Sequence, residues 1–164
     1  MAELTNWRNV LVHQRNPISG CIPTGYEWML KYVNKSGINY TTFQDEFDLI
    51  RNGQGSNDFV SIKKAIDAKY GDVGIHTKGF PDAQKKIAFM QQKIASDEPC
   101  LISLAVQGGW HIMPVVGCDL ECARFIHDVD QNLRVVSLWV VTYADIVARQ
   151  STSGGDDLAW IEQP

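Results

Sequence analysis

Residues 100–117 read CLISLAVQGGWHIMPVVG, and this stretch decides the expected fold class. Residues 100–106 form an apolar run of strand length. Residues 107–109 carry a turn signal, and residues 111–117 form a second apolar run. Pro114 favours an edge or a bulge there, because proline cannot donate to a sheet ladder. The stretch therefore predicts two strands joined by a tight turn.

The pattern differs on the two sides of this stretch. Downstream, we expect strands at 124–128, 135–141 and 158–161 and a short helix at 143–148. Upstream, residues 9–13 suggest a first strand or an extended lead-in. Helical patterns follow from Cys21 to a stop at Gly37, from a Thr41-Thr42 cap to Gly53, from residue 56, and over 82–95. Helices first and antiparallel strands second predict an α+β fold. With no repeat or long linker, residues 1–164 form one expected domain.

Composition narrows the classes of function. The 164 residues carry a net charge of −4, which gives no basic footprint for a nucleic-acid partner. No stretch approaches the roughly 20 apolar residues of a membrane span. No export signal is visible, so a cytoplasmic location is the default expectation. The oligomeric state stays open.

The four cysteines are expected to be free thiols. Cys100 and Cys118 lie in apolar strand-like runs and are interpreted as small buried hydrophobes. Cys118 and Cys122 lack the partner pair of a zinc site, so we expect no metal and no cofactor.

Cys21 and His111 are the candidate catalytic pair. A thiol at a helix N-terminus lies at the positive end of the helix dipole, which favours the thiolate. A histidine alongside can act as general base and acid. We therefore expect a thiolate–imidazolium pair near neutral pH. The remaining histidines are interpreted as structural or solvent-facing: His13, His76 and His127.

Other residues fill supporting roles. Asp128, at the end of a predicted strand, would orient the imidazole, with Asp130 and Asp119 as alternatives. Gln14 would donate its amide to an oxyanion together with the Cys21 backbone N–H. Trp110 is expected to pack against the histidine, and Trp110 and Gly109 are the candidate substrate contacts. Gly108 and Gly109 would let the backbone pass close to another element.

These residues carry a resemblance to a known family. Gln14, the Cys21–Thr24 run, the Gly108–Asp119 run and the Phe125–Asp128 run resemble a papain-like cysteine peptidase, closest to the bacteriocin-processing (double-glycine leader) branch. The resemblance implies a papain-like fold, with an N-terminal helical half that packs its nucleophile helix on a C-terminal sheet. It also implies Cys21 as nucleophile, His111 as base, Asp128 as orienting acid and Gln14 in the oxyanion hole. The chain departs from the family where Ile22 follows the cysteine and Val129 follows the aspartate.

The expected activity is hydrolysis of a peptide or related amide bond through a thioester at Cys21, with a peptide or protein as substrate. The same thiol chemistry could deamidate or transfer an acyl group, as in transglutaminases, because pocket shape and water exclusion decide the outcome. A domain that binds a peptide without cleaving it is the alternative from a different class.

Overall fold

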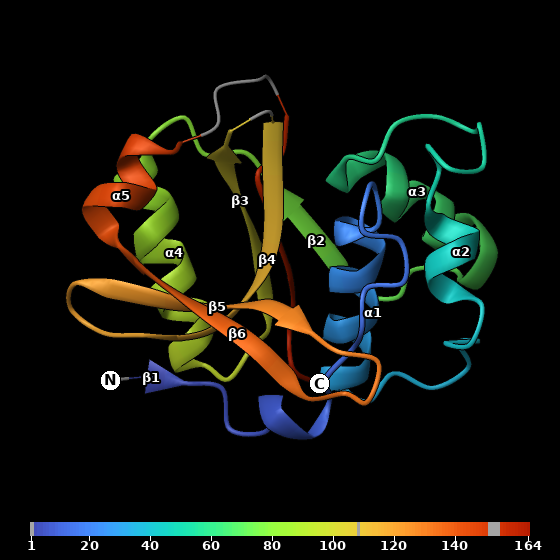
Figure 1. The fold of residues 1–164 in the computed structure, drawn as a ribbon, viewed down its shortest axis with the longest axis horizontal. Helices are drawn as coiled ribbons and strands as arrows, with labels where there is room; N and C mark the ends of the chain where they lie inside the picture. Colours follow the sequence, from blue (N-terminus) through green and yellow to red (C-terminus); the bar gives the residue numbers. More distant parts are fainter. Residues whose placement is uncertain (1, 108, 151–154) are drawn as a thin grey trace.

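One antiparallel sheet forms the centre of the computed structural model, which describes residues 2–107, 109–150 and 155–164 (Figure 1). Its seven strands run in the order β2-β7-β3-β4-β5-β6, and β1 also pairs with β4. The strands are β1 (Ala2–Glu3), β2 (Ile75–Lys78), β3 (Cys100–Val106), β4 (Gly109–Cys118), β5 (Cys122–Val129), β6 (Val135–Thr142) and β7 (Leu158–Ile161).

Helices lie on both sides of this sheet in Figure 1. They are α1 (Cys21–Tyr32), α2 (Phe43–Phe47), α3 (Phe59–Tyr70), α4 (Ala83–Ala95) and α5 (Tyr143–Ala148). Helix α1 packs on β4 and β7, whereas α4 contacts β1, β3 and β4. The approach of α1 is close, because a Cβ on Gly25 would lie 2.6 Å from a methyl carbon of Leu101 on β3.

The expected papain-like α+β architecture, a helical half packed on a separate strand half, is wrong. The sheet takes strands from both parts of the chain, since β1 and β2 precede residue 96 and pair with β4 and β7. The fold is a single seven-stranded antiparallel sheet with helices around it.

Most individual elements agree with the sequence patterns. Helices α3 and α4 begin after Asp58 and Asp82, whose side chains accept hydrogen bonds from backbone N–H groups of the first turn. Helices α1 and α2 end earlier than expected, at Tyr32 and Phe47. Of the two interpretations of residues 9–13, the strand is wrong, because residues 7–9 form a 3-10 turn and no strand follows before α1; the lead-in stays as the interpretation of this segment.

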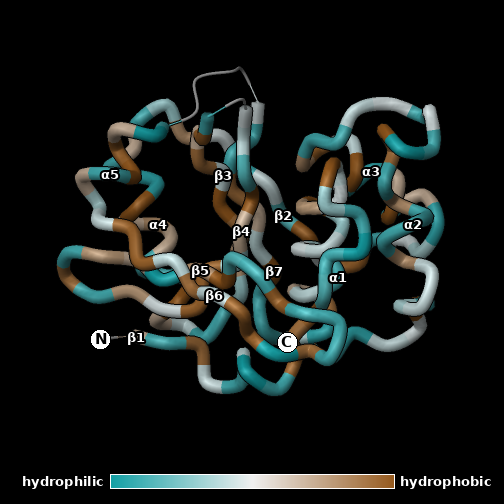
Figure 2. The backbone as a smooth tube through the Cα atoms, in the orientation of Figure 1, coloured by the Kyte–Doolittle hydropathy of each residue, from teal (hydrophilic) through white to brown (hydrophobic). Residues whose placement is uncertain are grey.

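The core lies between the sheet and the helices. Figure 2 shows hydrophobic backbone positions along β3 and β4 in the middle of the molecule. The largest fully buried aromatic side chains of the core are Trp28, Tyr26, Phe43, Phe59 and Phe125. Cys100 and Cys118 are buried, which confirms their interpretation as core residues.

A divergence between β4 and β5 positions the candidate site. These strands pair only from Val115 opposite Phe125 to Cys118 opposite Ala123, with an irregular register on the β4 side. Over residues 109–114, the only described strand that pairs with β4 is β3. Pro114 therefore lies where β4 has one free edge, in agreement with its predicted position. The first residue of α1 borders a cavity between these separating strands.

Candidate active site

Helix α1 begins at the candidate nucleophile and has no side-chain cap. Cys21 is its first residue, and the N-cap residue is Gly20. The backbone N–H groups of Cys21 and Ile22 have no acceptor within the helix, as at any helix start, and Pro23 has no N–H to satisfy. The positive end of the helix is therefore open beside the thiol.

Gly20 is required by the tight turn that leads into α1. Its N–H donates to the Asn16 carbonyl at 3.0 Å. A Cβ on Gly20 would lie 2.7 Å from that same carbonyl oxygen, closer than real Cβ contacts allow. The turn thus fixes where the helix and its first side chain start.

The four sequence-predicted catalytic residues border one cavity. Cys21, His111, Asp128 and Gln14 all line the cavity between α1, β4 and the end of β5, and they also line the groove that leads into it. The chain brings them together from a loop, a helix and two strands. Within the described residues, however, no hydrogen bond joins Cys21 to His111 or His111 to Asp128.

The electrostatics favour a neutral resting pair. Burial raises the pKa of the Cys21 thiol, and the Asp48 carboxylate adds to the rise; backbone N–H groups of Ile112, Ile22 and Cys21 oppose it without outweighing it. Burial also lowers the pKa of His111, and the neighbouring His127 lowers it further. The thiolate–imidazolium pair expected from the sequence is therefore not the resting form that this geometry favours.

His127 is a functional candidate that the sequence analysis set aside. Its ring centroid lies 5.6 Å from that of His111 in an edge-on arrangement. Its other face stacks on Trp139 at 3.9 Å, and its Nδ1 is 2.9 Å from the Ser137 hydroxyl. The β5 register is irregular here, because Ile126 and Asp128 face the successive β6 residues 138 and 137. His127 lies at this irregularity, which strict alternation does not reveal.

The three candidate orienting carboxylates have different surroundings. Asp130 accepts the backbone N–H groups of Asn132 and Arg134, and Asp119 accepts those of the turn 121–122. Both are therefore turn residues. Of these three carboxylates, Asp128 is the one that borders the cavity, and its side chain is exposed there.

Gln14 belongs to a loop whose backbone is hydrogen-bonded to the buried side chain of Gln44. The Gln14 amide donates one N–H to the Asn16 carbonyl at 2.8 Å, which leaves its second N–H available. The buried Gln44 donates to the His13 carbonyl and accepts the Arg15 N–H, on either side of Gln14.

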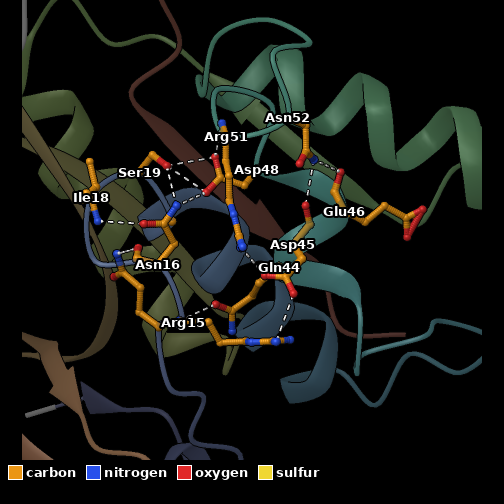
Figure 3. A network of polar contacts seen from close by, with 12 residues as sticks. Arg15, Asn16, Ile18, Ser19, Gln44, Asp45, Glu46, Asp48, Arg51 and Asn52 are labelled. Carbon is orange, nitrogen blue, oxygen red and sulfur yellow. Dashed lines mark hydrogen bonds and ion pairs between the residues drawn. The ribbon is translucent and has the colours of Figure 1, made fainter.

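The same loop is tied to the turn after α2 by Asp48 (Figure 3). The buried Asp48 carboxylate accepts hydrogen bonds from the Asn16 amide, the Ser19 hydroxyl and the Asn57 amide. Burial alone would raise the pKa of Asp48, but these bonds and the Arg51 N–H hold it below its ordinary value. The ionised Asp48 thus fixes the segment that leads to Cys21.

The expected packing of Trp110 against His111 and the expected close approach at Gly109 need correction, whereas their role as substrate contacts stays a prediction. The rings around His111 are those of His127 and Trp139, and no ring contact joins it to Trp110 within the described chain. Trp110 is 46% exposed and borders the grooves on both sides of Cys21. Gly109 has φ +153 with no atom near a virtual Cβ, so backbone conformation rather than close approach favours glycine there. Gly108 lies outside the described residues.

Comparisons with known proteins give no family: no family model matches the sequence, and no curated protein matches it. The described helices include none long and apolar enough to cross a membrane. The described residues also contain no group of three or more His, Cys, Asp or Glu side chains placed to hold a metal ion.

Proposed function

We propose that the protein is a thiol hydrolase that cleaves a peptide or related amide bond through a thioester at Cys21. The observation that carries the proposal is the shared cavity, which a cysteine at an open helix start lines together with a half-buried histidine and a glutamine. In this proposal His111 is the general base and acid; the His127 ring lies beside it, and Asp128 lines the same cavity.

The pKa directions support a general-base mechanism. Neutral His111 takes the Sγ proton as Cys21 attacks the carbonyl carbon of the scissile bond. The carbonyl oxygen gains the negative charge, and the Cys21 N–H and the second N–H of Gln14 stabilise it. The C–N bond then breaks and the amine leaves with the proton from His111. His111 then takes a proton from water, whose oxygen attacks the thioester; the C–S bond breaks, the acid leaves, and His111 returns the proton to the Cys21 Sγ.

The test combines cleavage with trapping of the thioester. We would incubate the protein with a mixture of internally quenched peptides and, after acid quenching, look by mass spectrometry for an acyl adduct at Cys21. We expect cleavage in the native protein and in Cys122→Ala, whose thiol is also half-buried, and none in Cys21→Ala. Cleavage that persists in Cys21→Ala would overturn the proposal.

The same experiment separates the alternatives. Release of ammonia from a glutamine peptide, or incorporation of an added primary amine without peptide cleavage, would indicate a deamidase or acyl transferase. Saturable peptide binding with no adduct at Cys21 would indicate a binding module.

A further inference from the structure

A second groove reaches the candidate nucleophile from the side of the turn after α2 and the start of α3. Cys21 borders it together with Ser103 and Ile112 from the sheet. Its apolar lining includes Ile18, Ile50 and Trp110, and its carboxylates include Asp58 and Asp156. The groove is therefore continuous with the site that cuts the substrate in the proposed function.

Three large apolar side chains in this groove face solvent. Ile18 is 94% exposed, Ile50 is 55% exposed and Trp110 is 46% exposed. They come from the loop before α1, the turn after α2 and the start of β4, so their convergence beside one thiol does not follow from a single amphipathic element. Exposed apolar side chains gathered in a concave surface are typical of a binding site.

The backbone that presents two of these side chains is fixed. The Ile18 N–H donates to the Asn16 side chain, and the Ile50 N–H donates to the Asn57 side chain, both at 3.1 Å. Asn16 and Asn57 in turn both donate to Asp48. The apolar surface is thus held in place before a ligand arrives, which lowers the entropic cost of binding.

The charge of the groove has one sign. Asp58 and Asp156 border it, and neither takes part in an ion pair within the described residues. Asp157 is neutralised by Lys86 at 3.0 Å, and no lysine or arginine is part of the described lining. The ionised Asp48 lies beneath the neighbouring loop and adds to the negative potential. A ligand that carries positive charge complements this surface.

We propose that this groove is a specificity subsite that takes a bulky apolar substrate residue next to a lysine or arginine. The inference rests on the proposed function, since it names the peptide that would reach Cys21. The apolar residue contacts Ile18, Ile50 and Trp110, and the cationic side chain lies toward Asp58 and Asp156.

The test uses internally quenched alanine-based octapeptides. One set places Leu beside Lys at each position in turn, and matched sets place Leu beside norleucine or Glu. We expect the best Leu–Lys peptide to exceed its Leu–Glu counterpart by about fivefold to tenfold in kcat/KM, as suits partly exposed charge pairs. The ratio should fall as salt rises.

Isosteric variants identify the residues that produce the preference for lysine over norleucine. In Asp58→Asn combined with Asp156→Asn, the advantage of Lys over norleucine should disappear, while the advantage of Leu over Ala stays; asparagine can still cap α3. Asp82→Asn is the matched control, because Asp82 caps α4 and is not part of the described groove lining. Ile18→Ala with Ile50→Ala should remove the Leu preference alone. An unchanged Lys preference in the double asparagine variant, or a preference for Glu, would overturn the proposal.

A direct measurement of peptide binding distinguishes a failure of the subsite proposal from a failure of the hydrolase proposal. Fluorescence anisotropy of labelled Leu–Lys and Leu–Glu octapeptides is measured on Cys21→Ala. Cleavage without a Leu–Lys preference overturns the subsite and leaves the hydrolase. Selective binding to Cys21→Ala with no cleavage by the native protein overturns the hydrolase and leaves the subsite as a peptide-binding groove. Neither binding nor cleavage of any peptide overturns both.

Discussion

Gln44 holds Gln14 through the two peptide groups that flank it. Its amide donates to the carbonyl before Gln14 at 2.8 Å, and its carbonyl accepts the N–H after Gln14 at 2.9 Å. The same carbonyl accepts the Thr24 hydroxyl of α1 at 2.9 Å. One buried side chain thus links the candidate oxyanion donor to the helix that begins with the candidate nucleophile.

We therefore expect Gln44→Ala to lower kcat by about tenfold with little change in KM, because a displaced oxyanion donor is lost mainly in the transition state. Gln92→Ala, on the exposed face of α4, is the control. If Gln44 acts through Gln14, adding Gln44→Ala to Gln14→Ala should cause no further loss of kcat. Additive losses, measured in the same steady-state peptide assay, would contradict this positioning role.

The pH dependence distinguishes the neutral pair from an ion pair. Because the pKa of His111 is lowered, kcat/KM should rise with pH through an acid limb below the ordinary histidine value of about 6.5. Because the pKa of Cys21 is raised, its alkylation by iodoacetamide should rise only above the ordinary thiol value of about 8.5. Mass spectrometry measures the extent of alkylation at each cysteine separately. Rapid alkylation of Cys21 at pH 6 in the native protein, if it is lost in His111→Ala, would instead show that the two residues rest as a thiolate–imidazolium pair.

His127 should set the position of that acid limb. In His127→Gln, removal of the neighbouring imidazole should raise the pKa of His111, so the limb moves to higher pH. His76→Gln is a matched control, since His76 also stacks on a tryptophan, Trp160, with centroids 5.1 Å apart. An unshifted limb in His127→Gln would show that His127 does not act on His111.

Asp48 should contribute to stability as well as to loop geometry. We expect Asp48→Ala to lower the free energy of unfolding by about 2–4 kcal/mol, because buried amide and hydroxyl donors lose their acceptor. Asp45→Ala should cost less than about 1 kcal/mol, since its ion pairs with Arg15 and Arg51 are exposed.

The Asp48 contribution has a defined pH sign. Its folded pKa is lowered, so the stabilisation is present above the unfolded value of about 3.9 and is lost as pH falls through the folded pKa. Urea unfolding at pH 7 and pH 3 should therefore show a smaller difference between native protein and Asp48→Ala at pH 3. An equal difference at both values would show that the carboxylate charge is not what matters.

Local signals made the helix starts predictable. Asp58 and Asp82 carry the hydrogen-bonding groups that cap their own helices, and these groups act within a few residues. Strand β1 has two residues, and its pairing of Ala2 with Cys118 spans more than two thirds of the chain. Such pairing depends on tertiary packing, so neither β1 nor the resulting architecture could be derived from periodicity.

The sequence predicted which residues would lie close together, whereas their catalytic roles stay predictions and their surroundings could not be derived from it. Residue types and order suggested Cys21, His111, Asp128 and Gln14, which border one cavity. The burial of Cys21 and His111, which sets the direction of their pKa shifts, could not be derived from the sequence. Neither the β5 irregularity at His127 nor the contact of its ring with His111 could be derived from periodicity.

In the proposed mechanism, the free edge of β4 makes thiol reactivity and sheet stability depend on the same backbone segment. The Ile112 N–H, which acts on the Cys21 sulfur, belongs to a strand segment that β5 no longer pairs with. Substitutions that extended the β4–β5 ladder would make the molecule more resistant to unfolding while displacing the thiol. Selection for thermal resistance alone should therefore favour variants in which β4 and β5 pair further and activity is lost. Selection for turnover should favour variants in which this segment of β4 stays unpaired with β5.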